Sequence, residues 1–167
     1  NAGVGAWKTR LPLVNPGELA VSEGQARADR TTVGHVVPTM DIGGMETVIA
    51  NLAGKIDSNR FRLVVLCLKH VGPIGLELED RGICVEPVPV MLPGLSFFYP
   101  RPLVRALRRH RAQIVHAHTG CWHKAAVAAR MCGAKGMIYT EHGRKVPDSR
   151  NLMRMDRMAE RITDCVV

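Results

Sequence analysis

The stretch Thr32–Leu52, TVGHVVPTMDIGGMETVIANL, decides the fold, because a strand is predicted to run through two glycines into a helix. Val33–Val37 is short, apolar and β-branched, as a buried strand is. The apolar side chains of the helix recur at the spacing of one helix face and are expected to face the core: Val48, Ile49 and Leu52.

The junction between this strand and this helix has the features of an anion-binding site. Free N–H groups point outward at a helix N-terminus, where the helix dipole favours negative charge. Gly43 and Gly44 have no Cβ, so a phosphate or a sugar can approach the backbone closely. The pattern is neither a P-loop nor GxGxxG, and a tight turn without a ligand is the alternative. Glu46 in the first helical turn either contacts a ligand or only complements the dipole.

Composition limits the classes of partner. The 167 residues suffice for one well-buried domain, and the net charge of +8 predicts a phosphorylated metabolite, an anionic membrane or nucleic acid as partner. An aromatic content of 4% offers few stacking platforms for bases, which counts against nucleic acid as the partner. Five scattered cysteines without a CxxC pair favour a reducing cytoplasm. No apolar run approaches the roughly 18 residues of a membrane span, and no signal peptide is recognised.

The order of the segments predicts the fold class. Residues 1–31 show no sustained periodicity and are interpreted as a leader, expected to be disordered and without chemistry. Residues 32–167 alternate between strand-like and helix-like runs, which predicts a Rossmann-like three-layer α/β domain with a parallel sheet. Further strands are expected at 61–68, 83–90 (an outer strand), 113–117, 136–140 and 163–167, and helices at 75–81, 102–111, 120–131 and 151–161. The chain starts without Met and stops inside a strand-like run, so a fragment is expected.

In such a sheet, ligands bind beyond the carboxyl ends of the strands, so the loops there carry the candidate site. His116 and His118 share a face of one strand, and with His123 or Cys121 they are a possible zinc site that lacks a nearby carboxylate. The preferred interpretation makes His116 a hydrogen-bonded core residue. It places His118 at a strand end that opens into the crevice, where it orients a substrate.

The loop Glu141–Lys145, EHGRK, follows the next strand. A carboxylate, an imidazole and two cations can hold hydroxyl groups and phosphate, so the candidate ligand contacts are Glu141, His142 and Arg144. A solvated polar loop without a ligand is the alternative.

A second candidate surface is Met91–Arg111, where an apolar, aromatic loop precedes a helix with arginines on one side. Aromatic rings at headgroup level and arginines facing anionic lipid would make an interfacial contact. The candidate residues are Phe97, Phe98, Arg101, Arg105 and Arg108. The alternative is a solvated basic face with the aromatic rings in the core or the cleft.

Three motifs, in order, resemble those of family 4 retaining glycosyltransferases. Asp41–Ala53, DIGGMETVIANLA, resembles their GG-x-E opening, and Ile114–His118, IVHAH, resembles their D-x-V-H-x-H strand, with Gln113 in place of the acid. Tyr139–Arg144, YTEHGR, is similar to their T-x-H strand end, in the form found in transferases of exopolysaccharide gene clusters.

The resemblance implies the N-terminal, acceptor-side half of a GT-B fold, in which a second domain, absent here, holds the donor. It implies a retaining hexosyltransferase-type enzyme that transfers a sugar from a nucleotide-sugar to a glycan or lipid-linked acceptor in polysaccharide biosynthesis. No metal or other cofactor is implied, and the location would be cytoplasmic or peripheral at the inner face of the membrane. By motif position His118 corresponds to the active-site histidine, and Gly43 and Gly44 approach the donor phosphate or the acceptor. This half alone is expected to show no turnover.

Two rival functions stay open. One is a non-catalytic basic α/β module that binds phosphorylated or anionic ligands, and the other is a different enzyme on this architecture, such as a sugar-nucleotide epimerase.

Overall fold

The computed structural model describes residues 30–89, 99–143 and 150–167. By its contacts the chain divides into residues 1–30 and Thr31–Val167, and the second unit is described here. The predicted leader therefore lies almost wholly outside the described residues. The strands are β1 (Thr31–Thr39), β2 (Phe61–His70), β3 (Cys84–Pro87), β4 (Ile114–His118), β5 (Gly136–Thr140) and β6 (Cys165–Val166). The helices are α2 (Gly44–Lys55), α3 (Pro73–Asp80), α5 (Arg101–Arg109), α6 (Trp122–Cys132) and α7 (Arg150–Glu160).

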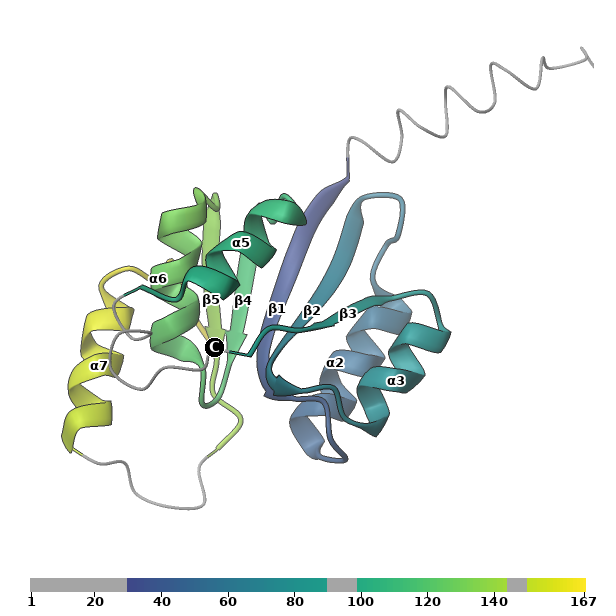
Figure 1. Cartoon of the computed structure of the whole chain (residues 1–167), viewed down its shortest axis with the longest axis horizontal. Coiled ribbons are helices and arrows are strands. Elements are labelled where there is room, and N and C mark those ends of the chain that lie inside the picture. The colour runs from purple at the N-terminus through teal and green to yellow at the C-terminus, as the bar shows by residue number, and fades with distance from the viewer. Residues whose placement is uncertain (1–29, 90–98, 144–149) are drawn as a thin grey trace, which may run out of the picture. The chain divides into compact units, whose positions relative to one another are not determined.

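The strands form one parallel sheet in the order β3-β2-β1-β4-β5-β6 (Figure 1). The strand order reverses direction between β1 and β4, which makes this pair the switch point where open α/β sheets bind ligands. The predicted α/β class with a Rossmann-like parallel sheet is confirmed, and the segment 83–90 does contain an edge strand, β3.

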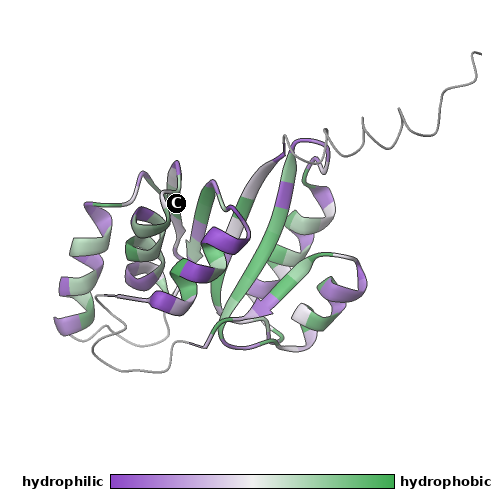
Figure 2. Cartoon of the chain, turned by 45° about the horizontal axis from the view of Figure 1, so that its top comes forward, coloured by the Kyte–Doolittle hydropathy of each residue, from purple (hydrophilic) through white to green (hydrophobic). Residues whose placement is uncertain are grey.

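The core has two halves because successive side chains of a strand point to opposite faces of the sheet. On one face, Val64 and Leu66 of β2 pack with the buried side chains of α5, α6 and α7. On the other face, Val65 and Cys67 pack with Ile49 of α2 and with buried side chains of α3. In Figure 2 the strands are mostly hydrophobic, whereas the helices alternate between hydrophobic and hydrophilic residues. The helices therefore bury only one side each.

Two predicted helix ends are confirmed by backbone geometry. Gly133 follows α6 with φ of 81°, in the left-handed region that a residue without Cβ adopts freely, and Gly82 lies just beyond α3 with φ of 79°. Other element ends agree with the predicted ones to within a few residues, apart from β3 and β6, which are shorter than predicted.

The prediction of which side of α2 packs on the core was wrong in part. Ile49 is 1% exposed, but Val48 is 54% and Leu52 is 39% exposed. The residues that pack with Ile49 are Met45, Ala53 and Ile56, each about one turn from the next. Val48 and Leu52 lie beside this row. Apolar residue type gave the approximate side of the helix, whereas the small residues Ala50 and Ala53, which also pack on the core, fixed its rotation.

Charge is distributed unequally between the two helical layers. The layer of α5, α6 and α7 carries many cations and few carboxylates, whereas α2 and α3 together carry four carboxylates and one cation. Exposed arginines on α5 are Arg101, Arg105, Arg108 and Arg109, as predicted. Within the described ranges, no helix combines the length and the hydrophobicity that crossing a bilayer demands.

Candidate functional site

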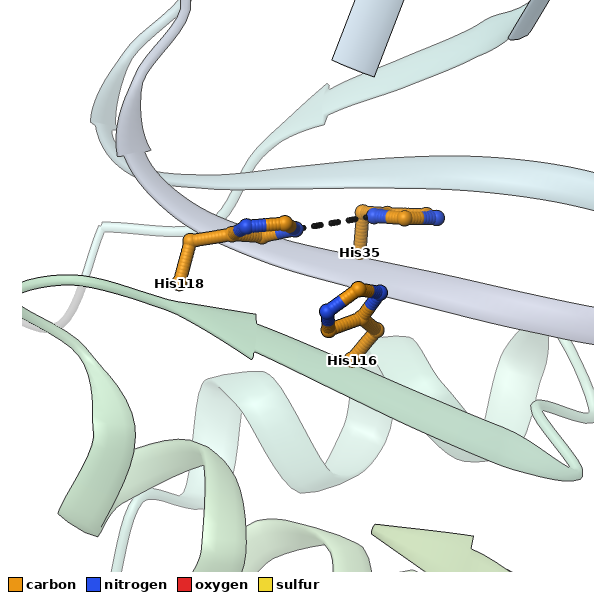
Figure 3. A group of neighbouring side chains, drawn as sticks. All are labelled: His35, His116 and His118. Carbon is orange, nitrogen blue, oxygen red and sulfur yellow. Dashed lines mark hydrogen bonds between the residues drawn. The ribbon is translucent and has the colours of Figure 1, made fainter. Parts of the chain in front are cut away.

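Three histidine side chains converge on one face of the sheet at the switch point (Figure 3). His35 of β1 lies directly opposite His116 of β4 in the strand register, and His118 follows two residues later. Because alternate residues share a face, all three rings lie on the side of the sheet that also carries Val33 and Val37 of β1. One candidate ligand atom from each residue lies within 4.8 Å of the other two.

Hydrogen bonds link His35, His118 and His142 into a chain that leads to the loop after β5. Nδ1 of His35 and Nε2 of His118 are 2.9 Å apart, and Nδ1 of His118 and Nε2 of His142 are also 2.9 Å apart. Nε2 of His116 lies 2.8 Å from Oγ1 of Thr140 on β5. A neutral imidazole has one donor and one acceptor nitrogen, so both nitrogens of His118 are used within the protein.

Burial keeps the three rings neutral. It lowers the pKa of His35 to about 3, with a contribution from the charge of His116. It lowers the pKa of His116 to about 4 and that of His118 to about 2, where repulsion from the neighbouring histidines adds to the effect. At neutral pH the group therefore offers uncharged nitrogen lone pairs.

The loops after β4 and β5 meet directly above this group. The backbone N–H of His142 donates to Oγ1 of Thr119 at 2.7 Å, and the Thr119 hydroxyl donates to Oε1 of Glu141 at 2.9 Å. The hydroxyl of buried Tyr139 donates to the other carboxylate oxygen of Glu141. His142 is half-buried and Glu141 is exposed. The rim thus presents a carboxylate and an imidazole whose positions are fixed by hydrogen bonds.

The glycine pair lies at the same edge of the sheet, after the neighbouring strand β1. Gly43 is the N-cap of α2, and no side chain of the described residues caps this helix with a hydrogen bond. A Cβ on Gly44 would meet no atom within 4 Å, so this backbone is open to approach. A Cβ on Gly43 would overlap the carboxylate of Glu46, which folds back over the helix start. Glu46 therefore already places negative charge where an anion was predicted, and a phosphate would have to displace it.

The structure corrects two expectations about the histidines. His118 was expected to open into the crevice, but its side chain is only 2% exposed because His35 lies against one nitrogen and His142 against the other. The third histidine of the cluster is His35, whereas His123 was the expected one and belongs to α6. Cys121 is not a member, since its thiol donates to the backbone oxygens of Val36 and His118.

His35 was not predicted as a site residue because ligands were expected in the loops after strands, whereas His35 lies in the middle of strand β1. The available signal was its parity: His35 shares a face with the apolar Val33 and Val37 on a strand that was predicted to be buried. His116 agrees with its interpretation as a hydrogen-bonded histidine, although it is only partly buried.

Other candidate residues lie elsewhere or outside the described ranges. Arg144, Phe97 and Phe98 are not among the described residues. On α5, the guanidinium carbon of Arg101 lies 4.6 Å from the ring centre of Tyr99, and Arg108 donates to the backbone oxygen of Met131 at 2.6 Å. Arg105 is exposed.

The fold and the site define a Rossmann-like α/β domain whose polar rim lies at the switch point of a parallel sheet. Residues 42–167 match the model of the family described as Glycosyltransferase Family 4, and the chain belongs to this family. No curated protein matches the chain.

The fold is similar to that in the crystal structure of Acinetobacter baumannii MurG, with a TM-score of 0.57 and 13% sequence identity. The likeness covers 81% of this chain and 40% of the MurG chain, so the chain spans less than half of that protein. The similarity supports the Rossmann-like GT-B class that the sequence predicted.

Proposed function

We propose that this chain is the acceptor-side half of a retaining glycosyltransferase, which transfers a hexose from a nucleotide-sugar to a glycan or lipid-linked acceptor. Family membership supports the reaction class. The likeness covers 40% of the MurG chain, as expected if this chain is one half of a two-domain enzyme.

One observation carries the proposal: the polar residues of two motifs that are far apart in the sequence are hydrogen-bonded to one another at the strand ends. His118 ends the motif of β4 and Thr119 follows it directly, whereas Glu141 and His142 belong to the motif Tyr139–Arg144. A rim of donors and acceptors that is fixed in this way can hold sugar hydroxyl groups without the entropy loss of ordering its side chains when the sugar binds.

We assign the roles by exposure and position. His142, half-buried at the end of the histidine chain, contacts the sugar directly, and His118 behind it fixes the tautomer and orientation of that ring. For His118 to touch the sugar itself, His142 would have to turn away from Nδ1 of His118. Glu141 accepts hydrogen bonds from hydroxyl groups of the substrate. Gly43 and Gly44 let a donor phosphate or an acceptor approach α2, with Glu46 displaced. Arg144 lies outside the described residues, and its position in the EHGR motif makes it a candidate contact for the phosphate.

The test uses the protein encoded by the complete reading frame and a panel of nucleotide-sugars, with release of free nucleotide as the measurement. We expect release with one or a few of them, and we expect residues 1–167 alone to show none. His142→Ala and His118→Ala should each lower kcat/KM by at least about 100-fold. The control His70→Ala, an exposed histidine that pairs with Asp41, should not change it. If no nucleotide-sugar is consumed, or if His70→Ala is as damaging as His142→Ala, the proposal fails. The anomeric configuration of the product, read by NMR, tests retention.

The cations on the layer of α5, α6 and α7 support a second candidate function, that of a non-catalytic module which binds anionic ligands. Such a module would bind polyphosphate or anionic polymer with an affinity that falls steeply with salt concentration, and it would leave nucleotide-sugars intact.

A further inference from the structure

The histidine group has a property that its role beside a sugar does not require. Three imidazoles from two adjacent strands bring their ring nitrogens together within 4.8 Å, in a place where His35 and His118 are almost fully buried. Two of the ligands are spaced i, i+2 on β4, and the third comes from the register position opposite the first. Strands hold such a group rigidly because the positions of all three Cα atoms are set by the sheet.

The outer nitrogens of the group already have partners of the kind that support metal ligands. Nε2 of His116 can donate to the Thr140 hydroxyl, and Nδ1 of His118 can donate to Nε2 of His142. With their protons on these nitrogens, Nδ1 of His116 and Nε2 of His118 carry the lone pairs, as in a ligating histidine whose other nitrogen is bonded, and the lone pair of His118 accepts the N–H of His35 until an ion takes its place. Nδ1 of His35 lies next to this Nε2.

We propose that His35, His116 and His118 form a binding site for a divalent transition-metal ion such as Zn²⁺. Three neutral imidazoles with a fourth position left for water are a known zinc arrangement. Nitrogen donors without any carboxylate exclude the hard ions Mg²⁺ and Ca²⁺, which take oxygen ligands.

The adjustment that the ion demands is small. Tetrahedral zinc with Zn–N distances of about 2.0–2.1 Å separates its ligand nitrogens by roughly 3.3 Å. The ligand atoms of the group lie within 4.8 Å of one another, and those of His35 and His118 are 2.9 Å apart because the two nitrogens share a hydrogen bond. Binding replaces that hydrogen bond: the proton on Nδ1 of His35 moves through solvent to Nε2 of the same ring, and the rings turn so that the lone pairs of both inner nitrogens face the ion.

A metal ion at this site would also affect the proposed reaction, although binding of the ion does not depend on that reaction. An ion at this site holds Nε2 of His118 and orients Nδ1–H toward His142. It therefore holds His142 at the rim in the orientation in which Nε2 of His142 accepts a hydrogen bond from His118.

The test is a Zn²⁺ titration of the metal-free chain, residues 1–167, in competition with a chromogenic chelator, after alkylation of the accessible thiols. Alkylation is needed because Cys84 and Cys165 are exposed. We expect one tightly held ion per chain. Co²⁺ should give the visible absorption of a tetrahedral site with nitrogen ligands and no thiolate charge-transfer band.

Two variants test the ligands and one controls for surface binding. His116→Gln, at a partly exposed position, should weaken Zn²⁺ binding at least 100-fold, and Thr140→Val, which keeps all three ligands, should weaken it about tenfold. His70→Gln removes the exposed pair with Asp41 and should leave binding unchanged. Circular dichroism establishes that each variant is folded. No binding by the wild-type chain, unchanged affinity in folded His116→Gln, or loss of binding in His70→Gln would each overturn the proposal.

Discussion

Val48 and Ile49 are neighbours on α2, and the sequence predicted that both face the core. From the structure we expect their truncation to have very different effects on the free energy of unfolding. Ile49 is 1% exposed and packs among Val33, Val37 and Leu78, whereas Val48 is 54% exposed. Ile49→Ala removes three buried carbons, worth about 0.8 kcal/mol each in transfer free energy, and leaves a cavity. We expect the free energy of unfolding to fall by about 3–4 kcal/mol. Val48→Ala should change it by less than about 0.5 kcal/mol, since alanine also favours the helix.

The measurement is urea unfolding of both variants and the wild type, followed by circular dichroism. With a slope of about 2 kcal/mol per molar urea, Ile49→Ala should lower the midpoint by about 1.5–2 M, and Val48→Ala by less than about 0.3 M. Leu52→Ala, at 39% exposed, should fall between them. Equal shifts for Ile49→Ala and Val48→Ala, at unchanged slopes, would refute the described rotation of α2.

Three further predictions concern other parts of the domain. Gly72→Ala should destabilise the fold by about 1–3 kcal/mol in the same urea assay, because its Cβ would overlap the backbone of Met40 and Asp41; Gly44→Ala, where a Cβ meets nothing, should not. Asp164 has a pKa below its ordinary 3.8 because Arg130 and the Met137 N–H bond its carboxylate, so its stabilising effect is present at neutral pH and is lost as the pH falls through that lowered pKa. Arg130→Gln should raise this pKa in an NMR titration, and an unchanged value would contradict the assignment. The double variant Arg101→Glu/Arg105→Glu should weaken co-sedimentation with anionic liposomes but not with neutral ones, whereas the same charge change at Lys55 and Arg81 on the other layer should have little effect. Binding that is equal for both lipids, or unchanged in this variant, would exclude α5 as a membrane contact.

The order of the elements was predictable because it depends on local signals. Short apolar runs such as 61–68 alternate with helical runs, and Gly82 and Gly133 mark helix ends by a backbone conformation that few other residues adopt. A parallel sheet follows from that alternation, since parallel strands need a crossover between them.

The candidate site was predictable only in part, because its geometry depends on pairing between distant segments. The sequence shows that His116 and His118 share a face, but it does not show that His35, about 80 residues earlier, lies opposite His116. The burial of His118 was missed for the same reason, since the rings that cover it come from β1 and from the loop after β5. The shift of the core row on α2 had a different cause: several side chains compete for one helix face, and apolar residue type alone does not rank them.

The unequal charge of the two helical layers has a further consequence. A domain with cations on the layer of α5, α6 and α7 and carboxylates on α3 has a permanent electric dipole across its thickness. Within about 8 Å of a negatively charged surface at physiological ionic strength, the field of that surface exerts a torque on the dipole. The torque turns α5 toward the surface before any contact is made. The strand ends lie between the two layers, so this orientation leaves the histidine rim facing sideways, along the charged surface.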